Sequence, residues 1–202
     1  MNLQNIYTQL QQLSFFEVAG FVTSLAGVWL AARQNVLTWP VGLVGVLLSL
    51  VVFYRERLFA DVVLQLFYVG TTAFGWYQWL YGSKQHSELK VAQTSANTIW
   101  LTLLLGAVLS PVAGFLFAEF TAAAVPYLDS ALAVFSVLAT VLMGRKLIEH
   151  WFFWIVLDLI YTGLYFYKQL YLYSLLYFIF TLLAIMGYRE WRLSLATKTA
   201  AA

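Results

Sequence analysis

The sequence predicts an all-α integral membrane protein with seven transmembrane helices, built as two parallel three-helix repeats joined by one linker helix. Three observations predict this class. Of the 202 residues, 62% are hydrophobic and only 10% are charged, whereas a soluble domain has about 25% charged residues. The hydrophobic residues fall into runs of about the length that crosses a bilayer, and the chain matches itself at one fixed offset. We therefore expect residues 1–202 to form a single membrane domain.

The composition argues against several other classes of function. The chain has no cysteine, so it forms no disulfide and uses no thiolate. Its histidines, His86 and His150, are far apart, and neither an H-E-x-x-H pattern nor a glycine-rich phosphate loop is present. The acids well inside the hydrophobic runs, Asp61 and Asp158, lie towards opposite surfaces. We therefore expect no enzymatic site, no cofactor, no metal ion and no nucleic-acid partner.

Seven hydrophobic runs follow one another along the chain, separated by short polar segments. Each run is about 15–23 residues long, against about 20 residues needed to cross the hydrocarbon core. Because backbone polar groups cannot stay unpaired in lipid, runs of this length are expected to be helices. The predicted spans are residues 16–32, 40–54, 58–79, 98–120, 127–143, 151–167 and 171–191.

Basic residues follow six of these spans and orient the chain. The loops on the side of the N-terminus carry three of them: Arg55, Arg57 and Lys168. The other side carries eight: Arg33, Lys84, Lys90, Arg145, Lys146, Arg189, Arg192 and Lys198. Lysine and arginine accumulate in cytoplasmic loops. We therefore expect the C-terminus to be cytoplasmic and the N-terminus to be outside.

The chain repeats itself at a single offset, without a gap. The first unit covers residues 16–79, the second covers 127–191, and the span at 98–120 links them. Each unit crosses the membrane three times, and the single crossing of the linker returns the chain to the side on which the first unit began. The two units therefore have the same orientation in the membrane. Transporters with this kind of repeat place their substrate between the halves. The matched pairs are Glu17 and Asp129, Ala19 and Ala131, Ser24 and Ser136, Arg33 and Arg145, Trp39 and Trp151, Leu58 and Leu170, Leu64 and Leu176, Gly75 and Gly187, and Trp79 and Trp191.

An aromatic stripe with one carboxylate marks the sixth span. Successive helical residues turn through about 100°, so Trp151, Trp154 and Asp158 fall within about 60° of one another. Tyr161 and Tyr165 extend the stripe. An acid inside a membrane span, such as Asp158, normally faces the bundle interior or a water-filled cavity. A cation placed over the face of a Trp ring gains about 0.5–2 kcal/mol. The stripe predicts a site for a flat, cationic or hydrogen-bonding solute; the alternative is a hydrogen bond from Asp158 to a neighbouring helix.

Polar residues of the third and seventh spans are further candidates. Gln65 lies at a depth similar to that of Asp158, and the repeat superposes Tyr177 on it. We expect both in the binding site, with a contact between helices as the alternative for Gln65. Asp61 lies one turn nearer the outer surface and is expected to pair with Arg55 or Arg57.

The remaining tryptophans and the glycines have structural explanations. Trp39, Trp79 and Trp191 lie at span ends, where aromatic belts are usual, and Trp151 could belong to the same group. Close contact between helices is expected at three glycines: Gly42, Gly45 and Gly70. Across the repeat, Trp154 corresponds to Gly42 and Asp158 to Val46. Trp154 and Asp158 therefore exist on one half only, as a site for an unsymmetrical solute requires.

Several motifs resemble one known family. Trp151-x-x-Trp154-x-x-x-Asp158 resembles the WxxWxxx(N/D) signature of the PnuC family of bacterial vitamin transporters. The similarity extends over about residues 16–191. It includes Trp39-Pro40-x-Gly42, Phe59-Ala60-Asp61-x-x-Leu64-Gln65-x-x-Tyr68, Gly75-Trp76-Tyr77-x-Trp79 and Leu164-Tyr165-x-x-Lys168-x-Leu170-Tyr171.

The resemblance implies both a fold and a function. The fold would be three helices, one linker helix and three helices, related to the SWEET sugar transporters, often as a homotrimer in the bacterial cytoplasmic membrane. The function would be facilitated diffusion of a vitamin precursor by alternating access, made one-way by a cytosolic kinase that phosphorylates the imported solute. No Walker motif that could use ATP is present.

The substrate implied by the resemblance is nicotinamide riboside, with thiamine as the alternative. Both are cationic, and Asp158 suits either charge. The asparagine form of the motif is associated with nicotinamide riboside in the family, which keeps thiamine open for this chain. An amide can donate and accept hydrogen bonds, so it pairs better with a neutral carboxamide. A receptor or scaffold without transport is the alternative from another class.

Overall fold

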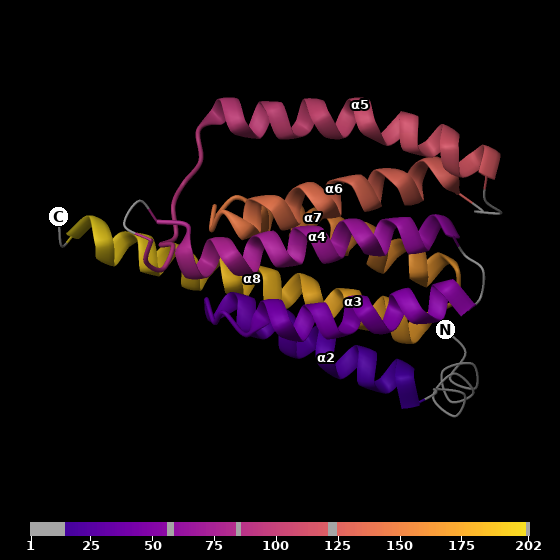
Figure 1. Ribbon diagram of the computed structural model, residues 1–202, viewed down its shortest axis with the longest axis horizontal. Coiled ribbons are helices and arrows are strands. Elements are labelled where there is room, and N and C mark those ends of the chain that lie inside the picture. The colour runs from indigo at the N-terminus through magenta and orange to yellow at the C-terminus, as the bar shows by residue number, and fades with distance from the viewer. Residues whose placement is uncertain (1–14, 56–58, 84–85, 121–124, 201–202) are drawn as a thin grey trace.

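The computed structural model describes residues 15–55, 59–83, 86–120 and 125–200. These residues form seven helices and no named strand, which confirms the predicted all-α class (Figure 1). The helices are α2 (Phe15–Ala32), α3 (Thr38–Arg55), α4 (Phe59–Tyr81), α5 (Ala96–Phe120), α6 (Pro126–Gly144), α7 (His150–Tyr167) and α8 (Tyr171–Ala200).

The observed helix ends lie within two residues of most predicted ends. The predicted start of the third span, at residue 58, lies outside the described residues. The prediction for the last helix was too short, because α8 continues past Trp191 to Ala200. Hydropathy marks where the chain leaves the lipid, but a helix does not have to end there. Arg189, Glu190 and Arg192 are charged and continue the same helix into the polar region.

The two three-helix units match in the structure as well as in the sequence. Helices α3 and α7 have the same length, 18 residues, and begin and end at equivalent positions of the repeat. The turns before them have equivalent residues with positive φ, 56° at Gln34 and 51° at Lys146. Within each unit the middle helix contacts both of its neighbours, and between the units α4 contacts α6 and α8 contacts α2. Helix α5 lies along one edge of the bundle and packs against α6 (Figure 1).

Four tryptophans join the two units at one end of the bundle. The ring of Trp39 meets Trp79 edge-on at 5.5 Å, and the equivalent Trp151 meets Trp191 edge-on at 5.7 Å. The ring centroids of Trp79 and Trp191 lie 5.9 Å apart. All four side chains are buried. The aromatic-belt explanation was therefore wrong for these residues, because their partners are other core side chains and not the lipid interface. We call this end the Trp end.

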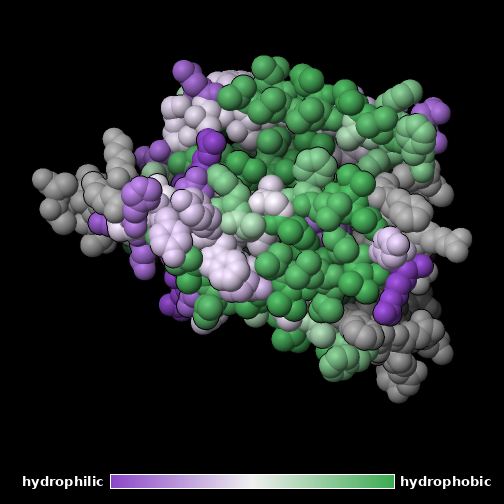
Figure 2. All heavy atoms as spheres, in the orientation of Figure 1, coloured by the Kyte–Doolittle hydropathy of each residue, from purple (hydrophilic) through white to green (hydrophobic). Residues whose placement is uncertain are grey.

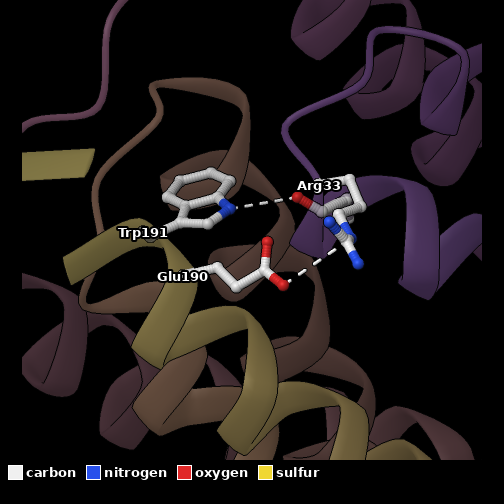
Figure 3. Close-up of polar contacts among 4 residues, drawn as sticks. Arg33, Glu190 and Trp191 are labelled. Carbon is white, nitrogen blue, oxygen red and sulfur yellow. Dashed lines mark hydrogen bonds and ion pairs between the residues drawn. The ribbon is translucent and has the colours of Figure 1, made fainter. Parts of the chain in front are cut away.

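The Trp end also carries two reciprocal hydrogen bonds between the units. The indole Nε1 of Trp79 donates to the carbonyl oxygen of Met143 at 2.9 Å, and that of Trp191 donates to Ala31 at 3.0 Å. Met143 and Ala31 are themselves equivalent positions of the repeat. An ion pair between Arg33 and Glu190, at 3.6 Å, lies beside the second bond (Figure 3). Each unit therefore holds the other at this end through equivalent atoms.

The surface is that of a membrane protein. Three helical segments qualify as membrane spans by length and hydropathy alone: Ala96–Phe120, Pro126–Gly144 and Tyr171–Ala196. Helices α4 and α7 are rich in tyrosine and tryptophan and carry polar residues, which lowers their mean hydropathy. Many large hydrophobic side chains are exposed around the bundle, and on the face in Figure 2 they cover the middle of the molecule while hydrophilic residues gather towards its ends. A lipid surround explains this distribution.

Candidate functional site

A cavity of about 440 Å³ lies between the two units. Its volume is in the range of about 300–1,000 Å³ that holds small-molecule ligands. Six of the seven predicted site residues line it: Gln65, Trp151, Trp154, Asp158, Tyr161 and Tyr177. The seventh, Tyr165, lies behind this lining, with its ring 5.3 Å from that of Tyr177. Residues from both units therefore meet at one space.

Helix α7 presents Trp151 at the Trp end of the cavity. The ring fits against Gly187 of α8, where an added Cβ would lie 2.5 Å from Cζ2 of the indole. His150 packs against both Trp151 and Trp191, at 4.4 and 4.7 Å between ring centres. The Nδ1 of His150 lies 2.7 Å from the carbonyl oxygen of Leu147. These contacts fix the indole of Trp151 in one position.

Asp158 lies one turn beyond Trp154 on the same face of α7. Its side chain is only 4% exposed, yet it lines the cavity. Among the described residues, neither an ion pair nor a hydrogen bond to its carboxylate is found; Thr162 donates to the backbone oxygen only. The alternative of a hydrogen bond to a neighbouring helix is thus not realised here. A buried carboxylate without a partner is costly, and a cationic solute in the cavity would offset that cost.

Stacked tyrosines continue the site towards the other end of the bundle. Tyr161 stacks on Tyr177 at 4.6 Å with 27° between the rings. Tyr165 stacks on Tyr173 at 5.5 Å, and Tyr173 meets Phe21 of α2 edge-on at 5.1 Å. We call this end the Tyr end. The contact with Phe21 joins the two units there, as the tryptophans do at the opposite end.

Helix α4 supplies a polar side of the cavity. Gln65, Tyr68 and Thr72 all line it and are spaced three and four residues apart, which puts them on one helical face. The hydroxyl groups of Tyr68 and Tyr161 both interact with Ser136 of α6. Tyr68, Thr72 and Ser136 were not predicted as site residues. The helical spacing from Gln65 could have identified the first two.

Three glycines of α3 and α4 do not have the predicted role. A Cβ built on Gly42, Gly45 or Gly70 meets no heavy atom within 4 Å. They therefore do not serve close contact between helices, and Gly42 and Gly45 line the cavity instead. The close contacts are elsewhere, since an added Cβ at Gly75 would clash with the ring of Trp39. The predicted pairing of Asp61 with Arg55 or Arg57 lies outside the side chains that the structure describes.

The lining of the cavity offers groups that can bind a solute. In the described part of the chain, no group of three metal-ligating side chains is found. The cavity combines aromatic faces, hydroxyl and amide groups and one carboxylate. These groups can hold a flat cation by its ring faces, its charge and its hydrogen-bonding edge.

The chain resembles several transporters of known type. It is 28% identical to the nicotinamide riboside transporter PnuC of Escherichia coli (strain K12), over 89% of this chain and 85% of the relative. It is 26% identical to the riboflavin/roseoflavin transporter RibM of Streptomyces davaonensis, over 90% of this chain and 86% of the relative. The fold matches the crystal structure of the vitamin B3 transporter PnuC with a TM-score of 0.73 and 22% identity, over 96% of this chain and 90% of that one.

Residues 14–193 match the sequence model of the family described as nicotinamide mononucleotide transporter. This match covers most of the chain and confirms the resemblance seen in its motifs. The protein therefore belongs to the nicotinamide mononucleotide transporter family, which includes the PnuC proteins, and it is a multi-pass membrane transporter for a vitamin and not an enzyme.

Proposed function

We propose that this transporter carries nicotinamide riboside by facilitated diffusion. The observation that carries the proposal is the unpaired Asp158 carboxylate beside Trp154 in the cavity between the units. Nicotinamide riboside has a cationic pyridinium ring, which the indole can hold by its face and the carboxylate by its charge. Its carboxamide and ribose offer hydrogen-bonding groups to Gln65, Tyr68 and Tyr161.

Thiamine is the second candidate, and one residue favours it. Asp158 stands where the family's nicotinamide riboside form of the motif has asparagine, and thiamine also carries a cationic ring. The relative RibM is named for riboflavin, whose ring system is neutral and has no charge to compensate Asp158. A neutral flavin therefore suits this cavity less well than either cation.

The two units suit transport by alternating access. They meet at the Trp end through the four tryptophans and at the Tyr end through Phe21 and Tyr173. Rocking of one unit against the other would open one end while the other stays closed. We expect the Trp end to face the cytoplasm, because eight of the eleven basic residues belong to that side. A homotrimer and a cytosolic kinase that traps the solute stay predictions from the family resemblance.

Uptake into liposomes tests this proposal directly. Purified protein in liposomes should bring internal nicotinamide riboside to its external concentration and no higher. Enclosing a nicotinamide riboside kinase with ATP should raise the internal label further, because the phosphorylated product cannot leave. Parallel assays with thiamine and riboflavin identify the preferred vitamin. Accumulation above the external concentration without the kinase would show that transport is coupled to an ion gradient, and binding without any uptake would indicate a receptor.

A further inference from the structure

The two units line the cavity with side chains of different size. From α2 and α3 the first unit contributes mostly small residues and valines, with Trp39 as their one aromatic; the small ones are Thr23, Ser24, Gly27, Ala31, Thr38, Gly42, Gly45 and Ser49. From α7 and α8 the second unit contributes five aromatic ones: Trp151, Trp154, Tyr161, Tyr177 and Phe180. In the alignment of the two units, Gly42 corresponds to Trp154 and Ser49 to Tyr161. At these two positions the first unit has a small residue where the second unit has a large aromatic one.

Gly42 and Gly45 have no packing explanation. They lie three residues apart on one face of α3, and a Cβ on either would meet nothing within 4 Å. By contrast, the ring of Trp151 fills the position of a Cβ on Gly187. Glycine weakens a helix relative to alanine, so two glycines with free space around them cost stability without gaining a contact. The space that they leave is part of the cavity.

A second observation connects this space with a ligand. The cavity that the glycines widen also contains the Asp158 carboxylate, which is 4% exposed and has no hydrogen-bond or ion-pair partner among the described residues. Val46, the residue after Gly45, is the equivalent of Asp158 in the repeat and lines the cavity too. Gly42 and Gly45 of α3 and Asp158 of α7 therefore line the same cavity.

We propose that Gly42 and Gly45 are specificity-determining residues of this transporter. Their missing side chains set the width between the α3 wall and Trp154, and so the size of the solute that can reach Asp158. The identity of the solute rests on the proposed function, whereas the width of the cavity is a property of the protein alone. A side chain at either position should exclude a large, multi-ring vitamin first and a single-ring nucleoside next.

Cysteine labelling tests the width without any vitamin. The native chain has no cysteine, so Ser49→Cys places a single thiol in the cavity beside the glycines. A small cationic methanethiosulfonate reagent should label it readily. Adding Gly45→Leu should slow the labelling at least tenfold. Adding Gly70→Leu should change it less than twofold, since Gly70 is exposed, lies outside the cavity and also has nothing within 4 Å of its Cβ.

Each outcome of the labelling decides the inference. Equal labelling rates of the Ser49→Cys thiol in the Gly45→Leu and Gly70→Leu proteins would overturn the assignment of the cavity width to Gly45. The absence of any labelling in both proteins would overturn it as well. Size-exclusion chromatography identifies any variant that does not fold, and Gly45→Ala then takes its place with an expected slowing of about threefold. Gly42→Ala provides the same test one turn nearer the Trp end.

Calorimetry then connects the width with selectivity. We expect Gly45→Leu to lower the affinity for nicotinamide riboside at least tenfold and Gly70→Leu to leave it unchanged. We expect Gly42→Ala and Gly45→Ala to weaken riboflavin binding more than nicotinamide riboside binding. If the native protein binds none of these vitamins while Gly45→Leu still blocks labelling, the proposed substrate is wrong and the width assignment stands. Unchanged affinities in the leucine variant would overturn the specificity role.

Discussion

Asp158 supplies the only carboxylate among the described residues that line the cavity, and its removal tests the site most directly. We predict that Asp158→Ala lowers the affinity for a cationic vitamin at least tenfold, which corresponds to about 1.4 kcal/mol. The loss follows from removing a charge attraction in a surrounding of low polarity. Isothermal titration calorimetry measures it, with Glu119→Gln as the control, because Glu119 is an exposed acid of α5 outside the cavity. An unchanged affinity would place the ligand elsewhere.

Helical periodicity predicted which residues share one face, while their role in binding stays a prediction. The spacing of Trp151, Trp154 and Asp158 put them on one face, and the structure places all three at one cavity. Tyr68 and Thr72 follow the same rule from Gln65 and were accessible to the same argument. The role of Gly42 could not be predicted in this way, because a glycine inside a membrane span is compatible with a close contact between helices and with an open space. Only the positions of neighbouring helices distinguish the two.

At the scale of elements, α7 packs closely against α8 because Gly187 of α8 has no side chain. We predict that Gly187→Ala destabilises the protein by about 1–3 kcal/mol, because the new Cβ would lie 2.5 Å from the ring of Trp151. The displaced indole would also weaken ligand binding. Thermal unfolding followed by intrinsic fluorescence measures the first effect and calorimetry the second.

A glycine of the same helix pair provides the matched control for this substitution. Gly163 of α7 has nothing within 4 Å of an added Cβ, so Gly163→Ala should leave the unfolding temperature unchanged or raise it slightly. Gly75→Ala repeats the test in the first unit, where the ring of Trp39 occupies the equivalent space. Equal unfolding temperatures for the Gly187 and Gly163 variants would contradict the packing assigned to Trp151.

The order and the lengths of the helices were largely predictable, and their lateral arrangement was not. Hydropathy located all seven helices, and the internal repeat in the sequence related α3 to α7. Nothing in a single sequence indicates that α4 contacts α6 or that α8 contacts α2. Those contacts depend on how the two units fit together, and they determine that Trp79 and Trp191 become core residues and not an interfacial belt.

For the whole molecule, the two indole hydrogen bonds at the Trp end are contacts between the units that single substitutions can remove. Each hydrogen bond contributes about 0.5–1.5 kcal/mol, whereas the partly exposed ion pair of Arg33 with Glu190 contributes about 0–1 kcal/mol. We predict that Trp191→Phe and Trp79→Phe each increase the population open at the Trp end by up to about tenfold, because each removes one bond and keeps an aromatic ring.

Spin labels on the cysteine-free chain measure this shift. Leu37→Cys and Arg145→Cys place one label in each unit, both at exposed positions of the Trp end. The distribution of distances between them should gain a longer component in Trp191→Phe and, because the two bonds are equivalent, a similar one in Trp79→Phe. Trp100→Phe, an exposed position on α5, should leave the distribution unchanged. If neither core variant moves the distribution, the indole bonds do not hold this end closed, and the four-tryptophan cluster has a structural role that is independent of transport.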